Sequence, residues 1–330
     1  MSDNCYLIDW FSASCCVDDY SEIFDILGFN SLEVCSSFQS GYGHHGYGKS
    51  LYLNGLYIYH DYYDDPRRCW VEMSGTGCRT FETYSEGVTF SDLFRRCVGD
   101  EPFFKLNRVD LAYDIYNDQL LFDRMKSAVS SGCVISKFGS YELTEGQKLQ
   151  GGLSCPDYVG RTMYFGSSKS ELLFRLYDKK LERIRDDIDS WYRWEIVFHR
   201  EKALELVTNL LSSDDVGAVF SAYLNEYISV RERSFTDSNY RRWNVPDWWR
   251  RFVQTSEHIN YLSKKDESYN VYNAQFLIEH QYGNTIDVIL QTMGADSLID
   301  LVNSRAQKMN LKQLNAVRLY NLEKGRGSVG

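Results

Sequence analysis

Alternation of apolar and polar residues dominates the first 205 residues and predicts β-strands. It is clearest in four segments: 104–116 (FKLNRVDLAYDIY), 161–167 (RTMYFGS), 171–179 (ELLFRLYDK) and 191–200 (WYRWEIVFHR). Residues 6–11 read as a first strand, and residues 69–82 as a strand followed by a tight glycine turn. Residues 41–62 alternate aromatic and small residues around glycines, which is typical of hairpins.

Segments with helical spacing lie between these strands, and helical spacing predominates in the last third of the chain. Residues 18–29, 90–98 (opened by a serine cap) and 118–132 are predicted helices, and KLERIRDDIDS is a charged helical turn. Strand, helix and antiparallel strands thus occur twice. The pattern predicts an α+β domain at 1–205, an antiparallel sheet with helices on one face, with related halves at 1–100 and 101–205. After residue 205 the period becomes helical, which predicts an α-helical accessory or DNA-recognition domain at 206–330.

Composition favours a cytoplasmic protein with no membrane segment. The longest apolar runs fall short of the roughly 20 residues of a membrane helix, and the N-terminus does not resemble a signal peptide. The nine cysteines have no CxxC or Cys/His zinc spacing, so we expect reduced structural thiols.

The net charge of −10 is unevenly distributed. The first 100 residues carry 6 Lys and Arg against 15 Asp and Glu, whereas residues 101–200 carry 15 of each. An acidic chain argues mildly against nucleic-acid binding. Because the acidity lies in the N-terminal third, the charge distribution does not exclude a basic surface elsewhere on the molecule.

Charged residues gather on one face of the predicted strands, because alternate residues of a strand share a face. Apolar residues occupy the opposite faces, so the charged faces would form one open surface. The residues predicted for this surface are Glu72; Arg108, Asp110 and Asp114; Arg175, Tyr177 and Lys179; and Arg193 and Glu195.

Such a surface has the components of phosphoryl transfer. Carboxylates without His or Cys suit a hard cation such as Mg²⁺ or Mn²⁺, which can polarise a phosphate oxygen. A tyrosine between cations could attack a phosphodiester and hold it as a phosphotyrosine. An alternative stays open at this point: Tyr177 could be one packing residue among 25 tyrosines, and Asp110 and Asp114 could simply pair with arginines.

Four stretches, in their order and spacing, resemble a known family. They are VEMSGTGCRTFE (71–82), RVDLAYD (108–114), YFGSSKSELLFRLYDKKLE (164–182) and RWEIVFHRE (193–201). Together they closely resemble the rolling-circle replication initiator family, which includes plasmid initiators, phage replication initiation proteins and conjugative-element relaxases. The likeness covers most of residues 6–205, while the C-terminal third matches only through the DWW segment and its following helices.

The resemblance implies sequence-specific DNA nicking and joining through a covalent 5′-phosphotyrosine, which initiates rolling-circle replication or conjugative transfer. It implies Tyr177 as the nucleophile, with Tyr164 as a rival, and Arg175 and Lys179 as its cationic neighbours. The implied metal ligands are Asp110 and Glu72, with Asp114 and Glu195 as further ligands or their partners. The family's carboxylates would hold Mg²⁺ or Mn²⁺, since the chain has no His-hydrophobe-His motif.

DNA, as a single-stranded or hairpin nick site, is the implied partner, with a host helicase and a second copy of the chain as further ones. Aromatic residues interleaved with arginine can stack bases and contact phosphates. The candidates are Arg193, Arg241, Arg242, Trp248, Trp249, Arg250 and Arg251. An interface between helices, capped by surface arginines, explains the six candidates between Arg241 and Arg251 equally well. The rival functions are a catalytically silent DNA-binding protein of the same fold and an unrelated metal-dependent phosphodiesterase.

Overall fold

The computed structural model divides the chain into two compact units, residues 1–259 and 260–330. It describes residues 4–99, 105–116, 118–150, 153–184, 187–213, 215–253 and 283–305, with Ile278 and Val317 besides. In the second unit, α11 (Gly283–Arg305) is interrupted at Gly294, whose φ is 81°. Helical structure is therefore confirmed over this segment, while residues 306–316 and 318–330 of the predicted helical domain lie outside the described residues.

Within the described residues, the first unit contains one ten-stranded sheet in which every neighbouring pair is antiparallel. Its order is β2-β3-β4-β5-β1-β6-β11-β10-β9-β8. The strands are β1 (Cys5–Cys16), β2 (Gln39–Tyr42), β3 (Tyr47–Leu53), β4 (Leu56–Tyr62), β5 (Arg68–Met73), β6 (Lys105–Ile115), β8 (Tyr141–Gln150), β9 (Leu153–Phe165), β10 (Leu172–Asp178) and β11 (Tyr192–His199). A separate short pair joins β7 (Val134–Ser136) to β12 (Ile228–Val230).

The two halves of the sheet share one topology. In each half, the strand that comes first in the sequence lies at the centre of the sheet and the strand that comes last pairs with it. The remaining strands follow toward the sheet edge in reverse sequence order. The first half therefore reads β1-β5-β4-β3-β2 and the second β6-β11-β10-β9-β8, joined by the antiparallel pair β1–β6. The repeated rhythm of the sequence corresponds to this repeated strand order.

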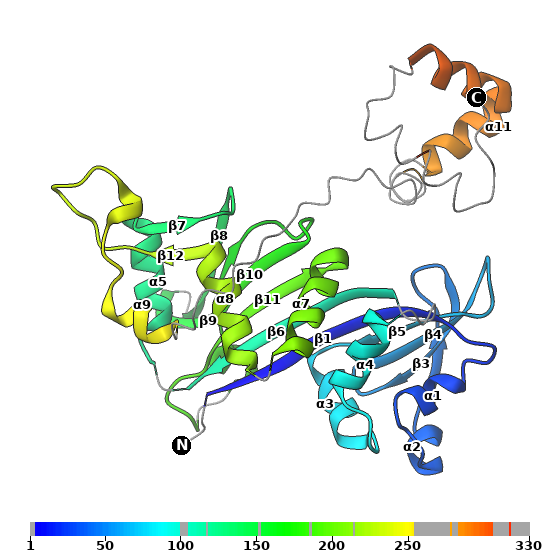
Figure 1. Cartoon of the computed structure of the whole chain (residues 1–330), viewed down its shortest axis with the longest axis horizontal. Coiled ribbons are helices and arrows are strands. Elements are labelled where there is room, and N and C mark those ends of the chain that lie inside the picture. Colours follow the sequence, from blue (N-terminus) through cyan, green and yellow to red (C-terminus); the bar gives the residue numbers. More distant parts are fainter. Residues whose placement is uncertain are drawn as a thin grey trace. The chain divides into compact units, whose positions relative to one another are not determined.

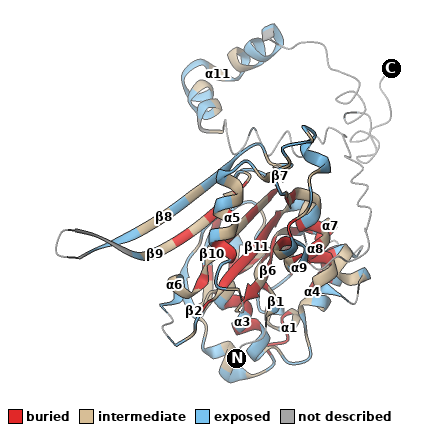
Figure 2. Cartoon of the chain, turned by 90° about the vertical axis from the view of Figure 1, so that its left-hand side faces the viewer, coloured by how far each residue is buried: buried red, intermediate tan, exposed pale blue. Residues whose placement is uncertain are grey.

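Helices cover the apolar face of the sheet, as predicted (Figure 1). The helix α7 (Arg200–Ser212) packs on β6 and β11 and buries Leu206 and Val207. The other helices are α1 (Glu22–Ile26), α2 (Leu32–Ser36), α3 (Gly75–Tyr84), α4 (Phe90–Val98), α5 (Leu121–Ser130), α6 (Lys179–Arg183), α8 (Val216–Tyr227) and α9 (Asp247–Phe252), with a 3₁₀ turn at Tyr240–Arg242. Burial is concentrated in the central strands, while β8 at the sheet edge is largely exposed (Figure 2).

Three local features differ from the predictions. The glycine-rich segment after β5 is a helix, α3, whose first residues lie close to the β3–β4 turn: a Cβ on Gly77 would lie 2.1 Å from the Gly55 carbonyl oxygen. Helix α4 is capped by Thr89, whose N–H donates to the Asp92 carboxylate at 2.9 Å, rather than by a serine. The compact unit continues to residue 259, beyond the predicted boundary at 205, because α7 and α8 belong to the core.

No helix in the described part of the chain combines the length and the apolar character of a membrane span. Cys5, Cys15, Cys16, Cys35, Cys69, Cys78, Cys97 and Cys133 are free thiols.

Candidate active site

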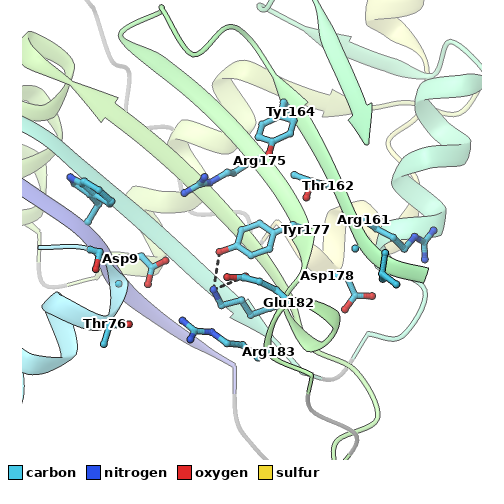
Figure 3. A pocket seen from close by; sticks show the side chains of 16 residues that line it. Asp9, Thr76, Arg161, Thr162, Tyr164, Arg175, Tyr177, Asp178, Glu182 and Arg183 are labelled. Atoms are coloured by element: carbon cyan, nitrogen blue, oxygen red, sulfur yellow. Dashed lines mark hydrogen bonds and ion pairs between the residues drawn. The ribbon is translucent and has the colours of Figure 1, made fainter. Parts of the chain in front are cut away.

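A pocket of about 470 Å³ opens on the polar face of the sheet (Figure 3). Its walls come from β1, the start of α3, β9, β10 and α6, so segments far apart in the sequence meet here. Strand register explains the clustering: Arg175 pairs with Glu195 and with Tyr164, and Tyr177 pairs with Arg193. Paired residues lie on the same face, so the polar sides of neighbouring strands adjoin.

Tyr177 points into the pocket from β10 (Figure 3). Its hydroxyl donates a hydrogen bond to Glu195 Oε2 at 3.0 Å and accepts one from Lys179 Nζ at 3.3 Å. Burial, and next the charge of Glu195, raise the pKa of Tyr177 above its ordinary value. The phenol is therefore neutral at rest and reacts as a nucleophile only when a neighbour takes its proton.

Lys179 is 3% exposed, which is unusual for a lysine. Burial lowers its pKa, and an ion pair between its Nζ and Glu182 Oε2 at 2.8 Å opposes that shift. The ammonium is held between Glu182 and the Tyr177 oxygen (Figure 3). It is in place to stabilise negative charge that develops on the phenol.

Asp110 and Glu195 form a buried carboxylate pair compensated by two arginines. Arg108 donates to both oxygens of Asp110, at 2.7 and 2.6 Å, and Arg175 forms ion pairs with Glu195 and, at 3.6 Å, with Asp110. Burial and the nearby charge of Asp110 raise the pKa of Glu195 to about 7, which Arg175 partly opposes. Neighbouring carboxylates repel each other, so the pair needs cations beside it.

A second buried network lies next to the pocket around Arg193. Its guanidinium donates to both oxygens of Asp114, at 2.5 and 2.7 Å, and pairs with Asp9 at 2.6 Å. A register shift between Ile8 and Trp10 inserts Asp9 as an extra residue of β1, and its carboxylate lies beside Gly75 at the start of α3. Asp9 was not among the residues predicted from the sequence, although it is the one charge within the apolar stretch YLIDWF.

Comparison with known proteins shows the family to which the chain belongs. Residues 104–303 match the family described as replication initiation factor, and residues 5–96 match the rolling circle replication initiation protein N-terminal domain. The chain belongs to the replication initiation factor family.

Two relatives support this membership. The putative DNA relaxase NicK of Bacillus subtilis (strain 168) is 27% identical over 263 residues, which span 75% of this chain and 70% of NicK. The solved structure of the rolling circle replication initiator protein from Geobacillus stearothermophilus superposes with a TM-score of 0.68. It is 28% identical and covers 76% of this chain and 96% of its own. The predicted family and α+β fold are therefore confirmed.

Of the four carboxylates predicted for the metal of this initiator family, the structure brings two together. Asp110 and Glu195 lie beside each other with Arg175 paired to both, whereas Asp114 is engaged by Arg193. Glu72 lies on β5, which β1 separates from β6, and its cross-strand neighbours are Ser12 and Tyr57. In the described ranges, no three His, Cys, Asp or Glu side chains gather as a metal-binding group. The chemistry of the Asp110–Glu195 pair fits a hard cation; Glu72 and Asp114 do not join it.

Two residues predicted to bind DNA are buried, which corrects that assignment. Trp249 is 1% exposed and packs against Trp194 and Phe252 on the apolar face, because α9 docks there. Arg193 is 4% exposed and already fully engaged by carboxylates. Neither side chain is available to contact DNA.

The remaining DNA-binding candidates lie around α9. Arg242 pairs with Asp237 and Arg250 with Asp247, while Arg241 and Arg251 are exposed. Trp248 lines a second pocket, 6.0 Å from the Arg124 guanidinium. For these residues a DNA contact stays a prediction.

Proposed function

We propose that Tyr177 cleaves one DNA strand and becomes attached to the 5′ phosphate. As a member of the replication initiation factor family, the protein nicks DNA to initiate rolling-circle replication or strand transfer. The observation that carries the tyrosine mechanism is the position of the Tyr177 hydroxyl, held between Glu195 and Lys179 inside the pocket.

The chemistry follows from these two hydrogen bonds. The Tyr177 oxygen attacks phosphorus, and its proton passes to Glu195 Oε2, which already accepts it as a hydrogen bond. The bond from phosphorus to the 3′ oxygen breaks, and that oxygen takes a proton from solvent water and leaves as a hydroxyl. Attack of a 3′ hydroxyl on the phosphotyrosine reverses these steps and joins the strand.

Cations around Tyr177 stabilise the charge that forms during attack. Lys179 Nζ faces the phenol oxygen at 3.3 Å, and Arg175 lines the same pocket. Because the pocket is partly removed from water, each charge interaction there is stronger than on an open surface. Arg175 and Lys179 are thus proposed to lower the energy of the transition state rather than to bind the ground state.

Mg²⁺ or Mn²⁺ is proposed as the cofactor, with Asp110 and Glu195 as the residues that would hold it. Such an ion supplies a Lewis acid for a phosphate oxygen. A host helicase and a second copy of the chain are further proposed partners, which the family resemblance implies. Sedimentation alone and with helicase would test both.

A matched pair of variants tests the assignment of the nucleophile. Tyr177→Phe is expected to lose the covalent adduct with a single-stranded nick-site oligonucleotide, because it lacks the attacking oxygen. Tyr164→Phe is expected to keep it: Tyr164 lines the same pocket, but no hydrogen bond to a carboxylate or lysine is found for it in the described part of the chain.

Denaturing gels measure the adduct, and thermal unfolding checks that both variants fold. An adduct in Tyr177→Phe, or its loss only in Tyr164→Phe, contradicts the proposal. DNA binding without an adduct in the wild-type chain would favour the catalytically silent alternative. The family match argues against an unrelated phosphodiesterase.

A further inference from the structure

The two halves of the sheet correspond residue by residue on the polar face. Trp10 of β1 faces Asp110 of β6 across the central join. Two residues further along each strand, Ser12 pairs with Glu72 and Ala112 with Glu195. Glu72 therefore occupies in the first half the place of Glu195 in the second.

Counting residues along the paired strands in the same way identifies a tyrosine in the first half that corresponds to Tyr177. Ser14 and Asp114 lie four residues beyond the central pair. Ser14 pairs across strands with Trp70, which in turn pairs with Tyr59. In the same way Asp114 pairs with Arg193, which pairs with Tyr177. Tyr59 is thus the positional counterpart of Tyr177. The first half keeps a tyrosine and a glutamate at the places where the second half has its nucleophile and proton acceptor.

The cations, however, are replaced. Tyr57 stands where the second half has Arg175, and Trp70 where it has Arg193. Asp61, two residues after Tyr59, takes the place of Lys179. Without positive charge this position is unsuited to attack on a phosphodiester, so it is not a second nicking centre.

Aromatic rings occupy this face instead, and we call Tyr52, Tyr57, Tyr59 and Trp70 the aromatic platform. The Tyr52 and Tyr57 ring centroids are 4.6 Å apart, and the Tyr57 and Tyr59 rings stack at 5.5 Å. Tyr52, Tyr57 and Trp70 are partly exposed, while Tyr59 is 5% exposed beneath them. The exposed imidazole of His45 stacks on Trp70 at 5.4 Å.

The platform continues from the active-site pocket along one surface. Trp10 lines the pocket, and the Arg108 guanidinium lies over its ring at 4.4 Å. From β10 the surface crosses β11, β6 and β1 to reach β5. Four strand spacings amount to about 19 Å, a span that a few unpaired nucleotides can bridge.

We propose that the aromatic platform stacks unpaired bases of the DNA strand that enters or leaves the Tyr177 pocket. This inference rests on the proposed function, since it takes the nicked strand as its ligand. Stacking needs no positive surface and accepts every base, so it suits the acidic N-terminal third of the chain. Duplex DNA keeps its bases paired and presents phosphates, which this surface has little charge to neutralise.

Binding measured apart from cleavage tests the platform. In a Tyr177→Phe background, Tyr57→Ala and Trp70→Ala should each weaken binding of a mixed-sequence single-stranded oligonucleotide about tenfold. The salt dependence of binding should keep its slope, because no phosphate contact is lost. Fluorescence anisotropy at several salt concentrations gives both quantities, and Trp70→Phe should restore most of the affinity.

Phe235→Ala is the matched control, because Phe235 is 95% exposed and lies outside the platform. Unchanged affinity in Tyr57→Ala and Trp70→Ala overturns the platform, as does an equal loss of duplex binding or a reduced salt slope. If Trp70→Ala fails to fold, Tyr57→Ala decides the matter. An adduct in Tyr177→Phe would refute the nucleophile assignment and leave the binding result standing.

Discussion

At the scale of residues, the candidate site is a balance of buried charges. Asp110 and Glu195 are each fully buried, a position that carboxylates take only when paired. Arg108 and Arg175 supply the pairing, and the hydrogen bond to Tyr177 uses the remaining oxygen of Glu195. The nucleophile is thereby tied to the same network that would have to admit a metal ion.

The metal dependence of nicking should distinguish Asp110, a proposed metal ligand, from Glu72, which lies away from the carboxylate pair. Asp110→Asn should raise the Mn²⁺ concentration needed for half-maximal nicking at least tenfold, because a proposed ligand loses its charge. Glu72→Gln should leave that concentration unchanged, since Glu72 lies on β5 away from the carboxylate pair. Nicking rates across a metal titration measure both. A shift in Glu72→Gln and none in Asp110→Asn would return Glu72 to the ligand set.

At the scale of elements, α3 connects the fold to the pocket. Ser74, Gly75 and Thr76 line the pocket at the start of this helix. The helix lies against the β3–β4 turn, where Asn54 and Gly55 have positive φ values of 42° and 83°, as a tight hairpin turn requires. The contact between the two backbones leaves no room for a side chain at Gly77.

Gly77→Ala should therefore destabilise the protein by about 1–3 kcal/mol and reduce nicking, since α3 must shift away from Gly55. Gly139→Ala is the control: nothing lies within 4 Å of the added Cβ, and it should be neutral. Chemical denaturation gives the free energy of unfolding for both. Equal stability of the two variants would show that the close approach is relieved at no cost.

At the scale of the whole molecule, the sheet and its covering helices form one unit that extends past the predicted boundary. Leu206, Val207, Phe220 and Tyr223 of α7 and α8 are buried in its core. A chain ending at residue 259 should fold cooperatively and remain soluble, whereas one ending at 205 should aggregate because the apolar face of β11 loses its cover. Circular dichroism and gel filtration distinguish the two. A soluble, folded 1–205 chain would restore the boundary at 205.

Periodicity predicted most of the strands and the charged face, because alternation reports directly which side of a strand is buried. Arg175, Tyr177 and Glu195 were placed together in this way. It did not place Asp9 on the charged face, since a bulge breaks the alternation and only its isolated charge within YLIDWF marked it. Nor did it predict α3, whose glycines signal a turn but serve a close backbone approach. The prediction that Trp249 binds DNA was wrong because adjacent residues of a helix point in different directions. Trp248 lines a pocket, while Trp249 enters the core.

The strand order also has a consequence for how the chain is made. All five strands of the first half precede β6 in the sequence, so this half can assemble as soon as it leaves the ribosome. Until β6 arrives, β1 is an open sheet edge with unpaired N–H and C=O groups, ready to join another nascent chain. Slower synthesis beyond residue 100 would lengthen that exposure, so codon choice there should govern the yield of soluble protein.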